Sequence, residues 1–275
     1  MYKLKVSSIG KILEPSVNED SAIAKGNLIA VSDGAGGGGV FAERWSEYLV
    51  NKLPLTPITS FDQLDSWIES IWEPFYLSCE EEAKKIGGMF LDKFYNEGSF
   101  ATLACAWYAY EKVHWLAYGD SVVFHYNRKT GLLEHSFGTL ADFNSAPYLI
   151  NCKDELNPKG FKCGTFSIET DDVIFICSDA LAHYILASYY IAYDKIYNNE
   201  LKTAIESRTK NENFILSAQN RKTGSFSLII NPLLNSISHN LNFKRHINML
   251  LNQKLIANDD YSMAMMDFSL SYSCS

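Results

Sequence analysis

The segment Leu28-Ile29-Ala30-Val31-Ser32-Asp33-Gly34-Ala35-Gly36-Gly37-Gly38-Gly39 decides how the rest of the chain is interpreted. Its first part, Leu28–Ser32, is a short apolar run followed by turn-forming residues, which is typical of a buried strand. Asp33 stands directly at the end of this strand, and a glycine-rich loop follows it. We therefore take Asp33 as a candidate site residue and ask which other residues share its position in the fold.

The glycine loop has a rival interpretation. Gly34, Gly36 and Gly39 satisfy the pattern G-x-G-x-x-G after a strand and before a helix, which is the context of a dinucleotide-binding loop. The Asp33 carboxylate would repel a bound pyrophosphate, however, and the helical segment 60–85 stands where a second strand ending in an acidic residue is required. A flexible loop without a ligand is a further interpretation that the motif alone leaves open.

Other acidic residues also stand at the ends or starts of expected strands. Asp120 follows the apolar run 115–119, and Asp179 follows the run 174–178. The pairs Glu19-Asp20 and Asp259-Asp260 precede the expected strands 21–24 and 261–268. Because one edge of an antiparallel sheet collects strand starts and ends alternately, all of these positions can meet at a single edge. Each aspartate alone is better explained as a turn residue, and only the set of positions together argues for a site.

Carboxylates that meet in this way repel one another unless a cation neutralises them. Hard divalent ions with oxygen ligands, Mg²⁺ or Mn²⁺, fit this role. The six histidines and six cysteines show no metal-ligand spacing, so a zinc site is not expected. The acidic positions therefore predict a site for Mn²⁺ or Mg²⁺.

The order of the expected elements indicates the fold class. The expected strands are 3–9, 21–24, 28–32, 102–110, 113–118, 122–126, 173–177 and 261–268, and the expected helical stretches are 41–49, 60–85, 181–197 and much of 200–256. Segment 136–164 is expected to be loop. Because helices do not alternate one by one with strands, the pattern favours an α+β fold with antiparallel sheets over a doubly wound parallel sheet. We expect a single domain over residues 1–275.

Composition excludes several classes of protein. The formal net charge of −8 argues against a nucleic-acid partner bound through broad phosphate neutralisation. No apolar run approaches the roughly 18 residues of a membrane span, and the N-terminus lacks the apolar stretch of a signal peptide. The cysteines are scattered without close pairs, which favours a reducing, cytoplasmic location.

Six short motifs, in this order and at these positions, carry a resemblance to a known family. They are 18–21 (Asn-Glu-Asp-Ser), 32–37 (Ser-Asp-Gly-Ala-Gly-Gly), 98–102 (Gly-Ser-Phe-Ala-Thr), 119–121 (Gly-Asp-Ser), 177–181 (Cys-Ser-Asp-Ala-Leu) and 259–262 (Asp-Asp-Tyr-Ser). The series resembles the metal-dependent protein phosphatases of type 2C (the PPM family), in its bacterial form. It covers nearly the whole chain, although the helical region 185–256 matches poorly.

The resemblance implies a four-layer α-β-β-α sandwich, in which a central antiparallel β-sandwich is flanked by helix pairs. It also implies hydrolysis of phosphoserine and phosphothreonine with two Mn²⁺ or Mg²⁺ ions, and a third ion in some members. The implied partner is a phosphorylated protein substrate, linked to a serine/threonine kinase, with no nucleic acid and no membrane. A two-metal site activates water directly, so no side-chain nucleophile is required.

The resemblance also assigns roles by position. Asp33 resembles the carboxylate that bridges both metals, and Gly34 the residue that offers its backbone carbonyl. Asp179 and Asp259 resemble the remaining ligands of the metal pair.

Three further positions complete this set. Glu19 and Asp20 resemble the acidic pair that holds metal-bound water, and Asp120 the ligand of a third metal. Asp33, Asp179 and Asp20 are the expected catalytic residues.

The chain departs from the family pattern where substrate phosphate is bound. Many members carry an arginine at the position of Pro15, and Lys11 is the nearest basic residue. Ala35 stands where some members have a histidine, and Ala180 where glycine is usual. These departures favour the alternative of a weak or inactive regulatory module that binds phosphorylated partners. A phosphatase of small molecules is a third possibility.

Overall fold

The computed structural model describes residues 2–14, 16–206, 210–220 and 224–269. Its strands are β1 (Lys3–Ile9), β2 (Ser21–Lys25), β3 (Leu28–Ser32), β4 (Phe100–Ala101), β5 (Leu103–Ala109), β6 (Lys112–Tyr118), β7 (Val122–Asn127), β8 (Leu133–His135), β9 (Ile150–Asn151), β10 (Phe161–Ser167), β11 (Asp172–Cys177) and β12 (Tyr261–Asp267). Its α-helices are α1 (Ala42–Lys52), α2 (Phe61–Ile86), α3 (Gly88–Glu97), α4 (Asp179–Ala192), α5 (Asp194–Glu206), α6 (Lys210–Gln219), α7 (Ser227–Ser236) and α8 (Asn240–Asn252).

Two five-stranded sheets form the centre of the molecule. One has the strand order β1-β12-β11-β7-β8 and the other β10-β6-β5-β3-β2, while β4 and β9 form a small separate pair. Every strand pairing in the described part of the chain is antiparallel. The predicted α+β class with antiparallel sheets is therefore confirmed.

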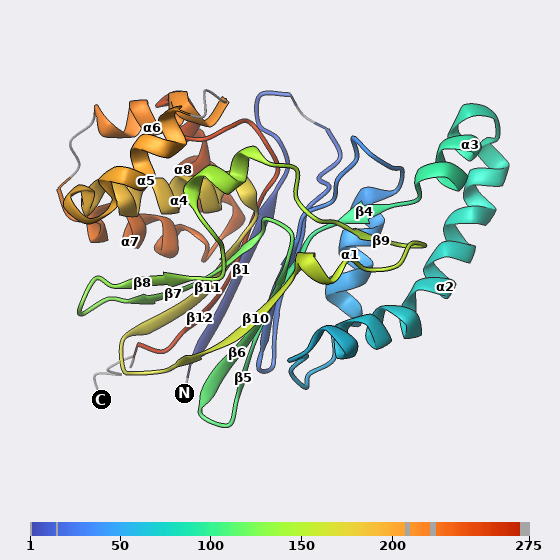
Figure 1. Ribbon diagram of the computed structural model, residues 1–275, viewed down its shortest axis with the longest axis horizontal. Coiled ribbons are helices and arrows are strands. Elements are labelled where there is room, and N and C mark those ends of the chain that lie inside the picture. Colours follow the sequence, from blue (N-terminus) through green and yellow to red (C-terminus); the bar gives the residue numbers. More distant parts are fainter. Residues whose placement is uncertain (1, 15, 207–209, 221–223, 270–275) are drawn as a thin grey trace.

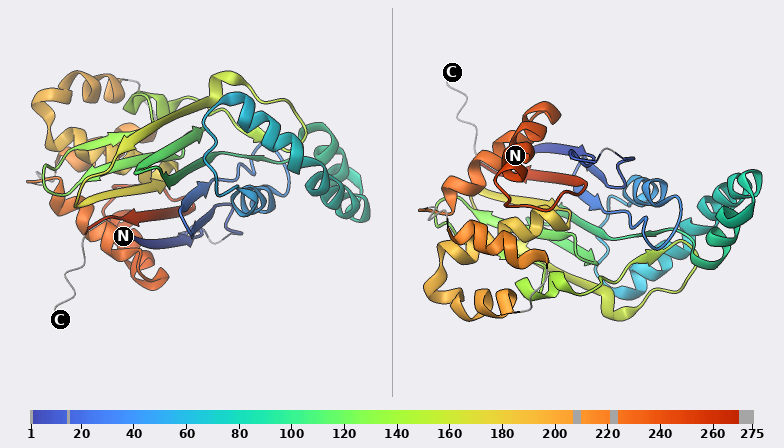
Figure 2. Two further views of the ribbon diagram at one scale, coloured as in Figure 1. Left: turned by 90° about the horizontal axis from the view of Figure 1, so that it is seen from below. Right: turned by 90° about the horizontal axis from the view of Figure 1, so that it is seen from above.

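Each sheet is covered on both faces. In β3, Ile29 and Val31 pack between the two sheets, whereas Leu28 and Ala30 face the layer of α1–α3. Successive side chains of a strand point to opposite faces, so a strand buried on both sides reads as an uninterrupted apolar run. The strands of the other sheet alternate in the same way between the inner core and the layer of α4–α8. Figures 1 and 2 show the resulting order of helices, sheet, sheet and helices.

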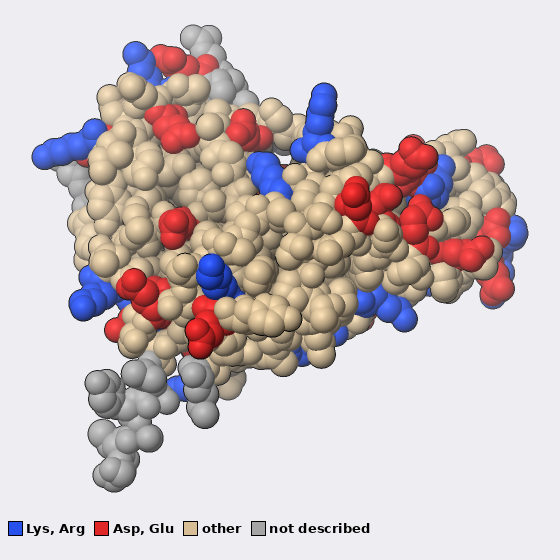
Figure 3. Space-filling model, turned by 60° about the horizontal axis from the view of Figure 1, so that its bottom comes forward, with Lys and Arg blue, Asp and Glu red and all other residues tan. Residues whose placement is uncertain are grey.

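Helices α2 and α3 extend away from the body of the molecule (Figure 1). The Ser60 side chain caps α2 by accepting a hydrogen bond from the Gln63 backbone amide at 3.3 Å. In the face shown in Figure 3, acidic side chains gather over this arm, while charges of both signs are scattered over the body. The acidic excess of the chain therefore lies partly on a projecting surface.

The structure differs from the expected elements in several places, of which two are informative. Helix α3 begins at Gly88, in a segment where no helix was predicted, and both Gly87 and Gly88 have positive φ. Strand β10 begins within the segment 136–164 that was expected to be loop and continues to Ser167. It is an edge strand, paired with β6 alone, and its side chains are largely exposed, so it lacks the apolar run that marks the buried strands. No helix among the described residues is long and apolar enough to cross a membrane.

Candidate active site

One edge of the sandwich collects the acidic residues singled out by the sequence. In one sheet, Ser21 pairs with Ser32, so the start of β2 and the end of β3 lie together. In the other sheet, Ile9 pairs with Tyr261 and Cys177 with Met263, which brings the end of β11 beside the start of β12. The turn 119–121 connects β6 of one sheet to β7 of the other at this same edge.

The structure brings five aspartates together at this edge. Burial, followed by the negative charges of Asp20, Asp179, Asp120 and Asp259, raises the pKa of Asp33, so carboxylates from both sheets lie within electrostatic reach of one another. We call this set, Asp20, Asp33, Asp120, Asp179 and Asp259, the carboxylate cluster.

Asp33 is held in place through its backbone. Its amide donates a hydrogen bond to Thr102 Oγ1 at 3.0 Å, and its carbonyl accepts one from the Thr102 amide at 2.8 Å. The Ser32 hydroxyl donates to the Thr102 carbonyl at 2.6 Å. Thr102 Oγ1 also lies 2.8 Å from Ser121 Oγ, next to Asp120. Thr102 is only 2% exposed and links two members of the cluster, although its sequence motif does not reveal this role.

The glycine loop allows Glu19 to approach the cluster. The Gly34 amide donates to the Glu19 carbonyl at 3.2 Å, and a Cβ at Gly34 would lie 2.6 Å from that oxygen. A Cβ at Gly36 would overlap the Glu19 carboxylate. These two glycines therefore serve close packing. Because β3 pairs with β2 and β5 in antiparallel fashion and helices follow it, the βαβ unit of a dinucleotide site is not formed.

Asp179 is positioned where β11 meets α4. It occupies the first turn of α4, where a negative side chain interacts favourably with the helix dipole. The Ser178 amide donates to the Ser262 carbonyl at 3.2 Å, and the Ser262 amide donates to Ser178 Oγ at 3.0 Å. This reciprocal pair joins the end of β11 to the start of β12 and fixes Asp179 relative to Asp259.

Burial and mutual repulsion disfavour the charged forms of the cluster. Burial, followed by the neighbouring carboxylates, raises the pKa values of Asp33 and Asp179 well above their usual range. Burial raises the pKa of Asp20 to about 7, with the charges of Asp260 and Asp259 adding to it. Burial and the charge of Asp259 raise the pKa of Asp120 to about 6. A bound cation would reverse these effects.

The donor set fits a hard divalent cation. Both carboxylate oxygens of Asp20 are buried without a hydrogen-bond partner, and such oxygens are costly unless they meet a cation or water. Among the described residues, no three His, Cys, Asp or Glu side chains converge tightly enough to hold an ion by themselves. A divalent ion bound here would therefore need water and main-chain oxygens as further ligands, as Mg²⁺ commonly does.

Glu19 and Asp260 form the rim of the site. Asp260 is 4% exposed, and its Oδ2 accepts a hydrogen bond from the Glu19 amide at 2.9 Å. Burial, with the charge of Asp260 contributing, raises the pKa of the Glu19 carboxyl, and the nearby Lys11 opposes this shift. The structure thus places every predicted site residue at one edge of the sandwich. The position of Pro15, where the family carries arginine, lies outside the described residues.

One buried histidine beside the cluster was not expected. A cavity of about 40 Å³ is lined by Asp179, His183, Phe143 and Phe214, among others. The His183 Nε2 atom is buried without a hydrogen-bond partner, and burial lowers the pKa of His183 to about 4. His183 follows Asp179 by four residues on α4, which puts both side chains on one helix face. That spacing was the sequence signal available for it.

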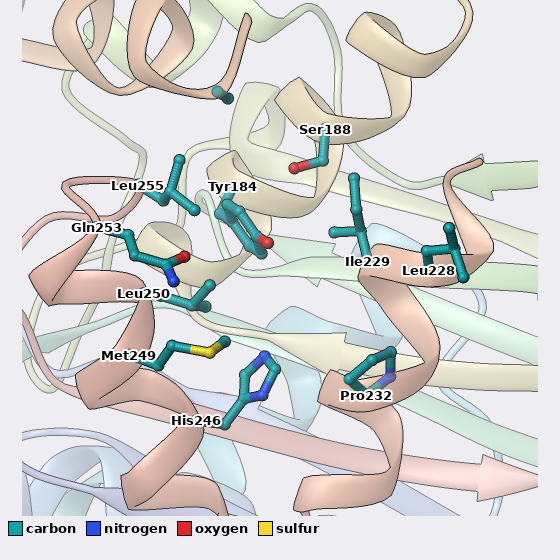
Figure 4. A pocket seen from close by; sticks show the side chains of 11 residues that line it. Tyr184, Ser188, Leu228, Ile229, Pro232, His246, Met249, Leu250, Gln253 and Leu255 are labelled. Carbon is teal, nitrogen blue, oxygen red and sulfur yellow. The ribbon is translucent and has the colours of Figure 1, made fainter. Parts of the chain in front are cut away.

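A more apolar hollow lies elsewhere, between α4, α7 and α8 (Figure 4). Its volume is about 160 Å³, and its walls include Ile229, Met249 and Leu250, with His246 and Ser188 as polar members. No acidic side chain lines it, so it does not offer the oxygen ligands that a divalent cation requires. The cluster remains the candidate active site.

Comparison with known proteins places the fold. No protein-family model matches the chain. No curated protein sequence matches it either. Among solved structures, the Mycobacterium tuberculosis serine/threonine phosphatase PstP/Ppp superposes with a TM-score of 0.58 at 15% identity, over 98% of this chain and 99% of that one.

Two further structures agree. The PstP catalytic domain in complex with two manganese ions gives a TM-score of 0.53 at 15% identity, over 97% of this chain and 99% of that one. The serine/threonine phosphatase Stp1 from Staphylococcus aureus gives a TM-score of 0.54 at 13% identity, over 97% of this chain and 95% of that one. The chain therefore has the fold of the bacterial serine/threonine phosphatases of type 2C, as its motifs predict.

Proposed function

We propose that this protein is a metal-dependent phosphatase that hydrolyses phosphoserine and phosphothreonine in protein substrates. The observation that carries the proposal is the convergence of five aspartates from two sheets on one edge of a phosphatase fold. The raised pKa values of Asp33 and Asp179 support a site that requires a cation at neutral pH.

The residues divide into distinct roles in this proposal. Asp33, Asp179, Asp259 and the Gly34 carbonyl would hold two Mn²⁺ or Mg²⁺ ions. Two such ions lower the pKa of a shared water and stabilise charge on the attacking and leaving oxygens of the phosphate.

The remaining acidic residues would act on solvent around the metal pair. Glu19 and Asp20 would orient metal-bound water through their carboxylates, and Asp120 would provide a ligand for a third ion. Thr102 keeps Asp33 in register with Asp120 through its hydroxyl, so it acts as a positioning residue. The proposed partners are phosphorylated proteins and, through them, a serine/threonine kinase.

A reducing, cytoplasmic location is part of the proposal. Cys79, Cys105, Cys152, Cys163 and Cys177 are all free thiols, which suits such a compartment. Cys274 lies outside the described residues.

Hydrolysis assays test the function directly. Turnover of p-nitrophenyl phosphate and of a phosphothreonine peptide is measured with Mn²⁺ and with a chelator, for the parent protein and for Asp33→Asn and Asp179→Asn. We expect turnover that requires Mn²⁺ and is lost in both variants. Turnover that persists in the chelator would reject the two-metal mechanism.

The same assays separate the alternatives. Tight Mn²⁺ binding without turnover of either substrate would indicate a regulatory module that binds phosphorylated partners. Turnover of the small ester but not of the peptide would indicate a phosphatase of small molecules.

A further inference from the structure

Lys11 lies at the rim of the carboxylate cluster because of the strand register. Ile9 at the end of β1 pairs with Tyr261 at the start of β12, so the residues just beyond both ends meet. Lys11 Nζ lies 3.4 Å from Asp259 Oδ1. Within the described residues, no other ion pair joins a lysine, arginine or histidine to a member of the cluster.

The backbone of Lys11 is anchored while its side chain stays accessible. Asp260 Oδ1 accepts a hydrogen bond from the Lys11 amide at 2.9 Å, and Oδ2 of the same carboxylate accepts one from the Glu19 amide at 2.9 Å. One buried carboxylate therefore holds both ends of segment 11–19. The Lys11 side chain is 29% exposed and that of Asp259 is 41% exposed, so their contact lies at the solvent-facing side of the cluster.

A phosphate ester that approaches this edge meets a strongly negative surface. The cluster, Glu19 and Asp260 are all acidic, and each like charge raises the cost of binding a phosphoryl dianion. A cation at the rim offsets this repulsion. Lysine suits the role because its ammonium is a compact point charge on a flexible stem and binds phosphate oxygens from several directions.

We propose that Lys11 binds the phosphoryl oxygens of the substrate and that its pairing with Asp259 competes with divalent-cation binding at that carboxylate. The proposal rests on the proposed function and adds the group that recognises phosphate. The Lys11 ammonium and a divalent ion are both cations that interact with the Asp259 carboxylate. Each therefore weakens the interaction of the other with Asp259. A Lys11 ammonium that leaves Asp259 stays at the rim, because its backbone is fixed by Asp260.

The test uses charge removal at Lys11 with a matched control. Lys11→Met keeps the length of the side chain without the charge, Lys11→Gln is a second uncharged variant, and Lys11→Arg retains the charge. Lys93→Met is the control, since Lys93 also pairs with a carboxylate, Glu97 at 3.7 Å, and is 37% exposed on α3. Mn²⁺ affinity is measured by calorimetric titration without substrate. Inhibition by inorganic phosphate, KM and kcat are measured with p-nitrophenyl phosphate.

Two opposite shifts are expected from the uncharged variants. The inhibition constant for inorganic phosphate rises about tenfold or more, since a hydrogen bond to a charged group is lost. The Kd for Mn²⁺ falls about two- to fivefold, because a partly exposed ion pair with Asp259 no longer competes. Lys11→Arg stays near the parent for phosphate, and Lys93→Met is unchanged in both measurements.

Each contrary result has a distinct meaning. A parent that binds Mn²⁺ and turns over substrate, with unchanged phosphate inhibition in the uncharged variants, overturns the assignment of Lys11 and leaves the proposed function intact. Weaker or unchanged Mn²⁺ binding in those variants overturns the competition with Asp259. Failure of the parent to bind Mn²⁺ overturns the proposed function itself, and the Lys11 proposal with it.

Discussion

The hydroxyl of Thr102 accepts a hydrogen bond from the backbone amide of Asp33 at 3.0 Å. This bond joins the end of β3, which Asp33 follows, to the start of β5, which follows Thr102. The same hydroxyl lies 2.8 Å from Ser121 Oγ. Thr102→Val removes this buried hydroxyl while keeping the shape of the side chain. We expect it to lower the free energy of unfolding by about 1–3 kcal/mol, because two buried polar groups lose their partner. Urea denaturation measures the change, and Thr102→Ser should remain near the parent.

The activity of Thr102→Val separates positioning from stability. If Thr102 positions Asp33, kcat falls in Thr102→Val at temperatures where the variant is fully folded, and Thr102→Ser restores it. A variant that is destabilised yet keeps the parent kcat would show that Asp33 is held by other contacts.

Two neighbouring glycines of the loop differ sharply in what a methyl group would meet. An alanine Cβ at Gly36 would overlap the Glu19 carboxylate, whereas one at Gly37 meets nothing within 4 Å. We therefore expect Gly36→Ala to reduce phosphatase activity by displacing Glu19, and Gly37→Ala to leave it unchanged. Steady-state kinetics at saturating Mn²⁺ makes the comparison. Equal effects of both substitutions would mean that loop flexibility, rather than space for Glu19, is the requirement.

Asp33→Asn should separate stability from activity. Burial, followed by the neighbouring carboxylates, raises the pKa of Asp33 well above the usual range, so the charged form is disfavoured in the folded protein. In chelator at pH 8, the free energy of unfolding of the variant should therefore exceed that of the parent by at least about 1 kcal/mol. Its turnover with Mn²⁺ should fall more than about 100-fold, since loss even of outer-shell metal partners costs 10–100-fold.

The control for this substitution is Asp92→Asn, an exposed residue on α3. It should change neither the stability nor the turnover. Lower stability of Asp33→Asn in chelator would contradict the repulsion inferred for the cluster.

The pH dependence of stability follows from Asp20. The folded-state pKa of Asp20, about 7, lies above the unfolded value of 3.8. The contribution of Asp20 to the free energy of unfolding is therefore fully present below pH 3.8 and is lost as the pH rises to about 7. Over this whole pH range, the loss in the free energy of unfolding is on the order of 4 kcal/mol. In chelator, the parent should lose stability between pH 5 and pH 8 relative to Asp20→Asn. Thermal unfolding of both proteins across this range measures the difference.

A divalent cation should reverse the pH dependence of stability. Mn²⁺ stabilises the charged form of the cluster, so the parent in Mn²⁺ should gain stability as the pH rises. Identical pH profiles of parent and Asp20→Asn in chelator would show that Asp20 titrates in its ordinary range.

The buried elements were predictable from the sequence because their patterns are local. Strand β3 reads as an apolar run since both faces are covered, and the bounds predicted for β1 and β3 agree with the structure. Helix α3 and strand β10 were not predicted. Only one residue of α3, Phe94, is fully buried, and β10 is a largely exposed edge strand, so neither carries a strong apolar signal.

The candidate site was predictable in part. The aspartates were found from their places at strand ends, and the structure brings them together. The supporting contacts were missed, although Thr102 and Asp260 themselves stand in the motifs. The hydrogen bond that Thr102 accepts, the two hydrogen bonds that Asp260 accepts and the environment of the unpartnered His183 nitrogen all depend on residues distant in the chain. Short polar side chains have many local uses, so residue types and spacing did not reveal these contacts.

The sequence by itself determined the α+β class, the strands that carry the acidic residues and the edge of each sheet on which those residues fall. The period-2 alternation of a strand and the antiparallel order of neighbours are sufficient for this. Only the tertiary structure decided that the edges of two separate sheets coincide, so that the Asp179 carboxylate of one comes within electrostatic reach of Asp33 at the edge of the other. Packing of one sheet on the other depends on side-chain fit across the whole inner core. The same packing turns a carboxylate with an ordinary pKa in the unfolded chain into a group that is best stabilised by a cation.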